Sequence, residues 1–266
     1  MKVMRSPDSA FDLRAALVEE VQTAVEIFES DPTAPKTIHR SRVALKRART
    51  LAAVGSVGAP GLADVFDNGA RAIMRAFAIS RDNWTLERTA RAMSRKVSKK
   101  ARRELRDLAD RAEAFQRTAT PLNIEATRAG LKDLLAIAQV WPEATARQVE
   151  RGVRQVVRRA RRTWRRARHD DTHGRHAWRK HEKARLYAAS LLSDAWPRNR
   201  RRRRKRNAQL AERLGDERDL TLLMARLTAD HPVNGGPHAL RDLRRIRKRL
   251  RRRIKKLGRQ LHADGA

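Results

Sequence analysis

The sequence contains no cysteine and has few aromatic residues, glycines, prolines and acidic side chains. The absence of cysteine excludes disulfide bonds and cysteine-ligated zinc. Aromatic residues make up only 4% of the chain, so surfaces on which nucleobases could stack are scarce. No apolar run approaches the ~20 residues of a membrane-spanning helix, and no apolar secretory segment precedes the first acidic residues. We therefore expect a cytoplasmic protein with no membrane contact.

What remains is typical of an all-helical protein. Hydrophobic residues, mainly Ala, Leu and Val, make up 40% of the sequence, while 12 glycines and 9 prolines are spread over 266 residues. Alternating β-branched runs are absent, and long stretches are rich in Ala, Arg, Leu and Glu. These residues favour helices, and their apolar fraction is sufficient for a packed core.

The charge is strongly positive. Lys and Arg total 63 against 30 Asp and Glu, which gives a formal net charge of +33. Like charges at this density repel one another, so a multivalent anion is the expected partner. Arginine dominates, and its planar guanidinium suits phosphate oxygens. DNA, RNA, an anionic membrane and a phosphate polymer all satisfy this argument.

Breaker residues divide the chain into helices. In the first half we expect helices over residues 11–30, 37–50, 62–79 and 124–140 and one or two helices over residues 86–117, with a bend or cap at "SRDNWT", residues 80–85. In the second half, "HDDTHG" (169–174) predicts a loop between two long helices. The arginine-rich residues 198–207 lead into a helical pattern with Leu210 and Leu214, and "TADHPVNGGPH" precedes a closing basic helix.

Two motifs recur with the same offset. His39, Arg42 and Lys46 match His176, Arg179 and Lys183 at an offset of 137 residues, and the pair at positions 81–82 matches the pair at 218–219 at the same offset. The identical register predicts an internal repeat, with one helical bundle at 1–140 and a second at 141–266. Residues 1–137 carry a net charge of +8 and residues 138–266 carry +25, so the second half attracts anions more strongly.

The repeated motif forms a cationic stripe. On a helix, His39, Arg42, Lys46 and Arg49 fall within about 80° of arc, with Arg47 beside them. In the second half, His176, Arg179, Lys183 and Tyr187 form the equivalent stripe, and Arg185 projects to the other side. Cations repeated every ~5.4 Å along a helix suit an anion with a charge on each unit. A solvated cationic face is the simpler interpretation of one stripe, but its repetition favours a binding surface.

These motifs resemble the CHAD family, the conserved histidine α-helical domain. "IHRSRVALKRAR" and "HAWRKHEKARLY" correspond to the two histidine-led basic helices of the family, and "ISRDNWTL" and "LGDERDLTLL" correspond to its two Arg-Asp or Asn-Asp segments. The resemblance spans roughly residues 10–260.

The resemblance implies two pseudo-twofold-related four-helix bundles with a basic central groove that binds inorganic polyphosphate, without catalysis, and possible association with polyphosphate granules. Carried over by position, the polyphosphate contacts would be His39, Arg42, Lys46, Arg47, Arg49, His176, Arg179 and Lys183, with Arg81 and Arg218 supporting the same surface. Leu186 departs from the family, which usually has a cation ten residues after the second histidine.

Other constellations support weaker alternatives. The net charge also suits an architectural nucleic-acid-binding protein, at least at low salt. Asp82 and Asp219 could serve a phosphohydrolase, but we interpret them as helix caps or ion-pair partners, and expect no enzyme and no cofactor. His169, His173 and His176 have the spacing of metal ligands, yet neighbouring arginines would repel a cation, so we expect no metal site. The five tryptophans are interpreted as packing residues.

Overall fold

The protein is described here from a computed structural model, which defines residues 11–118, 122–167, 172–192, 203–230 and 236–262. Within these residues the chain forms ten helices and no strand. The all-α expectation is confirmed. The helices are α1 (Leu13–Ser30), α2 (Pro35–Gly55), α3 (Pro60–Ala76), α4 (Ala78–Ser94), α5 (Lys99–Thr118), α6 (Ile124–Gln139), α7 (Ala146–Ala167), α8 (Thr172–Leu191), α10 (Arg204–Asp230) and α11 (Pro237–His262).

Local sequence signals set several helix starts. The Asp12 side chain accepts a hydrogen bond of 2.8 Å from the Ala15 backbone N–H, and Asn123 caps α6 in the same way through Ala126. Proline opens α2, α3 and α11. At the first helical position proline loses no intrahelical hydrogen bond, and its fixed φ suits a helix, so these three boundaries are readable from the sequence.

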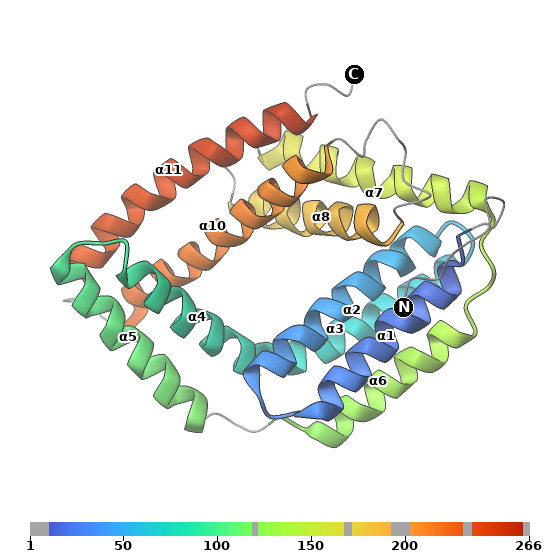
Figure 1. The fold of residues 1–266 in the computed structure, drawn as a ribbon, viewed down its shortest axis with the longest axis horizontal. Coiled ribbons are helices and arrows are strands. Elements are labelled where there is room, and N and C mark those ends of the chain that lie inside the picture. Colours follow the sequence, from blue (N-terminus) through green and yellow to red (C-terminus); the bar gives the residue numbers. More distant parts are fainter. Residues whose placement is uncertain (1–10, 119–121, 168–171, 193–202, 231–235, 263–266) are drawn as a thin grey trace.

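The helices are arranged around an oval, and the chain crosses from one end to the other and back (Figure 1). Helices α1, α2, α3 and α6 pack together at one end, and α7 and α8 join them through contacts with α2. At the other end α4 and α5 pack against α10 and α11, and α10 also contacts α8. Helix α2 contacts α1, α3, α4, α7 and α8, so it connects the two halves of the chain.

Three apolar clusters hold this arrangement together. The largest joins α1, α2, α3 and α6 to Val149, Val153 and Val156 of α7 and to the end of α8. A second cluster joins α4 and α5 to α10 and α11, and a third joins α7, α8, α10 and α11. Two of the three clusters therefore contain residues from both sides of the boundary at residue 140. The division at this residue stays a prediction about the repeat, because the packing crosses it.

Two helix boundaries differ from expectation. The bend expected at residues 80–85 is wrong, because these residues lie inside α4 and the chain turns at Phe77 instead. The fully buried Phe77 ends α3 with a backbone hydrogen bond to Ile73 and packs against Phe28 at 5.7 Å between ring centroids. Likewise, the end of the expected loop at 169–174 is helical, since α8 begins at Thr172; residues 169–171 lie outside the described part of the chain.

Other expectations can be compared directly. Leu210 and Leu214 are buried in α10, as the pattern after the arginine run predicts; residues 198–202 of that run lie outside the described segments. Trp141 and Trp178 are core residues, Trp164 packs against the third cluster, and Trp196 is not described. None of the helices in the described ranges combines the length and apolar character needed to cross a membrane.

The tightest helix crossing predicts a severe packing defect. At Gly152 of α7 an added Cβ would lie 2.1 Å from the carbonyl oxygen of Val54 in α2, which is backbone and cannot rotate away. Gly152→Ala should therefore lower the free energy of unfolding by about 1–3 kcal/mol, the usual cost of overpacking. Urea denaturation followed by circular dichroism measures this change.

Gly215 of α10 provides the matched control, because no atom lies within 4 Å of its added Cβ. Alanine is favoured over glycine inside a helix by about 1 kcal/mol, so Gly215→Ala should stabilise the protein. If Gly152→Ala raised the free energy of unfolding as Gly215→Ala is expected to do, α2 and α7 would not cross closely at this point.

Candidate polyanion-binding surface

The two histidine-led stripes occupy equivalent positions in their helices. His39 is the fifth residue of α2 and His176 is the fifth residue of α8, counted from Pro35 and Thr172. The two helices pack against each other in the structure. The stripes therefore come from neighbouring helices and do not lie on opposite sides of the molecule.

Several cations of the α2 stripe have partners within the protein. Arg42 is only 8% exposed and donates a hydrogen bond through Nη1 to the backbone carbonyl of Met74, in the last turn of α3. Helix ends leave such carbonyls without intrahelical partners, so Arg42 stabilises the end of α3. This contact accounts for the buried position of a residue that the sequence assigns to anion binding.

Arg47 and Arg49 form ion pairs with neighbouring helices. Arg47 Nη2 lies 2.5 Å from Oε1 of the buried Glu20 in α1. Desolvation raises the pKa of Glu20, and the positive charge of Arg47 opposes this shift. Arg49 contacts Asp67 Oδ1 of α3 through Nη2 at 2.5 Å and through Nε at 2.7 Å. Acidic residues absent from the α2 sequence are thus supplied by α1 and α3, and they reduce the repulsion along the stripe.

His39 contacts α4 through a tilted ring contact with Trp84. Its ring lies 5.1 Å from the ring of Trp84, and the guanidinium of Arg88 lies 5.0 Å from the centroid of the same Trp84 ring. The Trp84 ring therefore contacts both a histidine and an arginine of the protein, in agreement with its interpretation as a packing residue. Lys46 is half-buried on the same helix.

The α8 stripe faces two different environments. His176 is exposed, whereas Arg179 and Lys183 are half-buried. Desolvation lowers the pKa of Lys183 and Arg179 lowers it further, while Asp219, Asp216 and Glu212 of α10 act in the opposite direction. Lys183 therefore points toward an acidic stretch of α10 as well as toward Arg179.

The cations of α2 and α8 converge at Lys180. Desolvation lowers the pKa of this lysine, and repulsion from Arg49, Arg71 and Arg179 lowers it further, against an opposing effect of Asp67. Asp67 itself is shared, because its second oxygen lies 2.6 Å from Arg71 Nη2. One carboxylate therefore lies among three cations, Arg49 of α2, Arg71 of α3 and Lys180 of α8, and the local charge remains positive.

Tyr187 lies between the same helices. Burial raises the pKa of its hydroxyl, and the charges of Arg179 of α8 and Arg47 of α2 oppose this shift. Arg47, Arg49, Arg71, Arg179 and Lys180 thus form a mixed α2–α3–α8 group, which we call the α2–α8 cation cluster. It combines three of the residues predicted from the sequence with two others.

The sequence does not indicate Lys180 or Arg71. Neither follows from the repeat, because the positions 137 residues before Lys180 and after Arg71 are Val43 and Ala208. Leu186, which replaces the cation expected from the family, is equivalent to Arg49 by the same offset. Lys180 provides a positive charge close to Arg49 from a different turn of α8.

The remaining predicted residues are placed less centrally. Arg218 is half-buried on α10, next to the Asp219 that acts on Lys183. The side chain of Arg81 and all of His169 lie outside the described residues. Over the part of the chain that is described, no three His, Asp or Glu side chains are grouped as a metal site would require.

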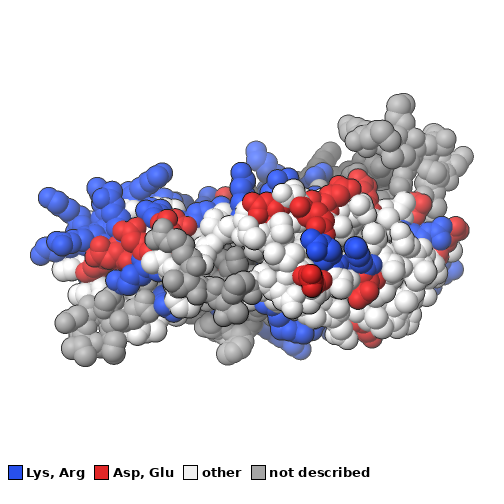
Figure 2. All heavy atoms as spheres, turned by 90° about the horizontal axis from the view of Figure 1, so that it is seen from below, with Lys and Arg blue, Asp and Glu red and all other residues white. Residues whose placement is uncertain are grey.

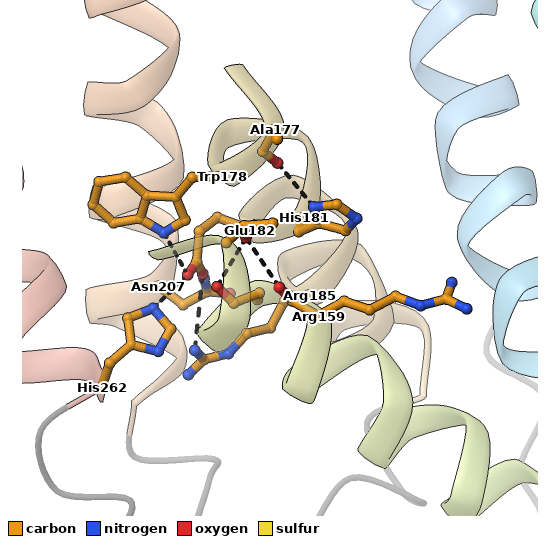
Figure 3. A network of polar contacts seen from close by, with 10 residues as sticks. Arg159, Ala177, Trp178, His181, Glu182, Arg185, Asn207 and His262 are labelled. Carbon is orange, nitrogen blue, oxygen red and sulfur yellow. Dashed lines mark hydrogen bonds and ion pairs between the residues drawn. The ribbon is translucent and has the colours of Figure 1, made fainter. Parts of the chain in front are cut away.

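A buried carboxylate anchors α8 behind this surface (Figure 3). Glu182 is fully buried and accepts hydrogen bonds from Trp178 Nε1 at 3.0 Å and Asn207 Nδ2 at 2.8 Å. His262 Nε2, at the end of α11, lies 2.6 Å from Glu182 Oε1, and its ring stacks on Trp164 of α7 at 5.0 Å. The network joins α7, α8, α10 and α11, and it fixes the helix that carries Arg179, Lys180 and Lys183.

Arg185 belongs to this network and not to the stripe. It is buried, and its Nη1 lies 3.8 Å from Glu182 Oε2. Its expected position on the other side of α8 is therefore confirmed. Although burial raises the pKa of Glu182, the hydrogen bond from His262 and the charge of Arg185 outweigh it and lower the pKa from 4.5. Glu182 is consequently ionised in the folded protein.

Charge is distributed unevenly over the molecule. Figure 2 shows the side formed by α5 and α6, where acidic side chains lie among the basic ones. Arg91 illustrates this mixture, since it contacts Glu87, Asp110 and Glu113 at 2.7–3.2 Å. In contrast, α2 contains six Lys and Arg residues and no acidic residue.

Comparison with known proteins identifies the family. The model of the CHAD domain matches residues 13–228, which includes both histidine-led helices. This chain belongs to the CHAD family. The resemblance inferred from the motifs is thereby confirmed, and the CHAD family is associated in general with polyphosphate binding.

A solved CHAD domain supports the fold. The crystal structure of the CHAD domain from the plant Ricinus communis is 19% identical and superposes with a TM-score of 0.67, over 98% of this chain and 96% of that chain. No curated protein matches the chain. The similarity to the plant domain supports the helical arrangement and carries no assignment of individual binding residues.

The Glu182 network predicts a pH-dependent contribution to stability. Because the pKa of Glu182 is lowered, its stabilising effect is present above the ordinary value of 4.5 and is lost as the pH falls through the lowered pKa. At neutral pH, Glu182→Gln should lower the free energy of unfolding by about 3 kcal/mol, the scale for breaking a buried charge network. Urea denaturation should show this difference narrowing as the pH falls below about 4.

Glu212→Gln on the exposed face of α10 is the control, and it should change the free energy of unfolding by no more than about 0.5 kcal/mol. If the difference in free energy of unfolding between the wild type and Glu182→Gln did not depend on pH, the charge of the carboxylate would not be what stabilises the network.

Proposed function

We propose that the protein binds inorganic polyphosphate on the surface formed by α2 and α8, as a binding protein and not as an enzyme. The Asp67 carboxylate shared by Arg49 of α2 and Arg71 of α3, close to Lys180 of the packed helix α8, carries this proposal. Repulsion within the α2–α8 cation cluster is a free-energy cost that a bound polyanion removes. A phosphate chain supplies one negative charge per unit and can contact cations from several helices at once.

The intramolecular ion pairs define which residues can bind. Arg47 and Arg49 each use part of the guanidinium on Glu20 or Asp67, and an arginine has five N–H donors, so these residues can also donate to phosphate. Arg42 has a structural role at the end of α3, so its replacement would disturb the fold as well as binding. We therefore assign the principal contacts to Lys46, Arg179, Lys180 and Lys183, supported by Arg47, Arg49 and His39.

Phosphate polymer fits this surface better than nucleic acid. Two aromatic residues lie near these cations: Tyr187, which is half-buried, and Trp84, which is also half-buried and contacts His39 and Arg88. Proteins that bind single strands without sequence preference usually stack bases on exposed aromatic rings. The net charge of +33 still gives non-specific affinity for nucleic acid at low salt. We expect long-chain polyphosphate to displace DNA from the protein at moderate salt, with little displacement in the opposite direction.

Neutralising the surface should weaken polyphosphate binding selectively. The triple variant Lys46→Gln, Arg179→Gln and Lys180→Gln removes three cations and leaves Arg42 and the ion pairs of α2 intact. Affinity should fall by about 100-fold, at roughly 1 kcal/mol for each lost contact. The slope of log K against log salt should decrease by about 2, at ~0.7 for each contact to a flexible polyanion. Fluorescence anisotropy of labelled polyphosphate over a salt series measures both quantities.

A control with the same change in charge lies on the outer helices. Arg103, Arg106 and Lys132 are exposed on α5 and α6, and their joint replacement by Gln should change the affinity by less than about fivefold. Equal weakening by both triple variants would overturn the proposal, because binding would then depend only on net charge.

The lowered pKa of Lys180 and Lys183 predicts weaker binding at alkaline pH. Both lysines lose their charge at lower pH than an ordinary lysine, whose pKa is 10.5. Affinity for polyphosphate should therefore fall as the pH rises through these lowered values, and binding at a pH where the free lysines are partly deprotonated should take up protons. Calorimetry in buffers of different ionisation enthalpy measures the proton uptake.

The double variant Lys180→Arg and Lys183→Arg should retain affinity at alkaline pH, since arginine stays charged. Lys132→Arg on α6 is the control and should reproduce the wild-type pH profile. If the double variant also loses affinity as the pH rises, these lysines do not contact the polymer.

A further inference from the structure

Helix α11 carries an excess of charge that the polyphosphate surface does not use. It contains twelve Lys and Arg residues and one Asp within 26 residues. The CHAD family model ends at residue 228, before α11 begins. Its cations therefore call for an explanation of their own.

The cations of one face of α11 line a pocket. Six of them repeat at intervals of three and four residues and span about 16 Å of the helix axis. A single arginine from the first turn of α8 closes the lining. The pocket has a volume of about 340 Å³ and is lined by Arg175, Arg244, Arg247, Lys248, Arg251, Arg252 and Lys255.

One wall of the pocket is held in place by α10. Arg251 Nε donates a hydrogen bond of 2.8 Å to Oε1 of Glu217, whose side chain is only 7% exposed. Pairing with a buried carboxylate reduces the rotamer freedom of Arg251, so less entropy is lost when a ligand binds. Glu217 does not itself line the pocket, and the lining is positive.

The lining selects the chemistry of the ligand. All seven residues are Lys or Arg, so the pocket attracts clustered negative charge and provides no aromatic side chain on which a nucleobase could stack. Its volume is at the lower end of small-molecule sites and accommodates a few phosphate groups. We infer that this pocket is a second anion site, for a compact ligand carrying several adjacent phosphates and no base, such as inorganic tripolyphosphate.

The second site adjoins the polymer surface without sharing its main contacts. Arg175 lies one turn before Arg179 on α8, whereas the other six lining residues belong to α11. No residue of the α2–α8 cation cluster lines the pocket. Loss of the α11 site therefore leaves the α2–α8 cation cluster intact, and each site can be tested in the absence of the other.

Calorimetric titration of tripolyphosphate tests the inference. Lys248→Gln with Arg252→Gln removes two exposed cations of the pocket and should weaken tripolyphosphate binding by about tenfold. Arg249→Gln with Arg253→Gln removes the same charge from exposed positions of α11 outside the pocket and should change the affinity by less than about threefold. ATP should bind no more tightly than tripolyphosphate, because the lining offers nothing to the base.

Long-chain polyphosphate separates this inference from the proposed function. The pocket variant should lose tripolyphosphate affinity and retain polymer binding, and the triple variant at Lys46, Arg179 and Lys180 should show the reverse. Equal weakening of tripolyphosphate by the pocket and control pairs would overturn the second site, as would equal loss of both ligands in the pocket variant. If the triple variant kept the wild-type affinity for long-chain polyphosphate, the proposed function would be overturned and the inference of the α11 site would be unaffected.

Discussion

Repulsion among the cations is the constraint on which the rest of this structure depends. A chain with a net charge of +33 can bring arginines and lysines together only where other interactions offset their repulsion. Around α2 the repulsion is reduced by the carboxylates of Glu20 and Asp67, which lie on neighbouring helices. Near α8 the repulsion is opposed by packing of the apolar clusters and by the buried carboxylate of Glu182, which is held by Trp178, Asn207 and His262. The helical frame thus holds a positive surface that would disperse in an isolated helix.

Helix α8 connects these features because its successive residues face different parts of the protein. Lys180 faces α2 and α3, Glu182 is buried toward α10 and α11, and Lys183 faces the acidic residues of α10. The helical rotation of about 100° per residue produces this separation. One helix therefore supplies both the cations of the proposed polyanion-binding surface and the buried carboxylate that fixes their position. Membership of the CHAD family agrees with this arrangement and gives it a general association with polyphosphate.

Local patterns predicted much of the fold and part of the site. Breaker residues separated the helices, and the offset of 137 residues placed His39 and His176 at the same position of two helices, which the structure shows packed together. The bend expected at residues 80–85 was wrong, because the buried Phe77 ends α3 earlier and the polar residues after it continue as a helix. Arg42 has the spacing of a surface cation, yet it is buried against the carbonyl of Met74. Spacing along one helix does not indicate what the next helix presents.

The sequence by itself determined the helical class, the positive charge, the repeated cationic stripes and the family resemblance, because composition and periodicity are properties of the chain. Only the tertiary structure decided which cations meet. Lys180 and Arg71 join Arg49 through contacts between residues far apart in the sequence, and Arg47 and Arg49 acquire partners that α2 does not contain. The physical reason is that the electrostatic environment of a side chain depends on distances in space and on desolvation, and both are set by how the helices pack.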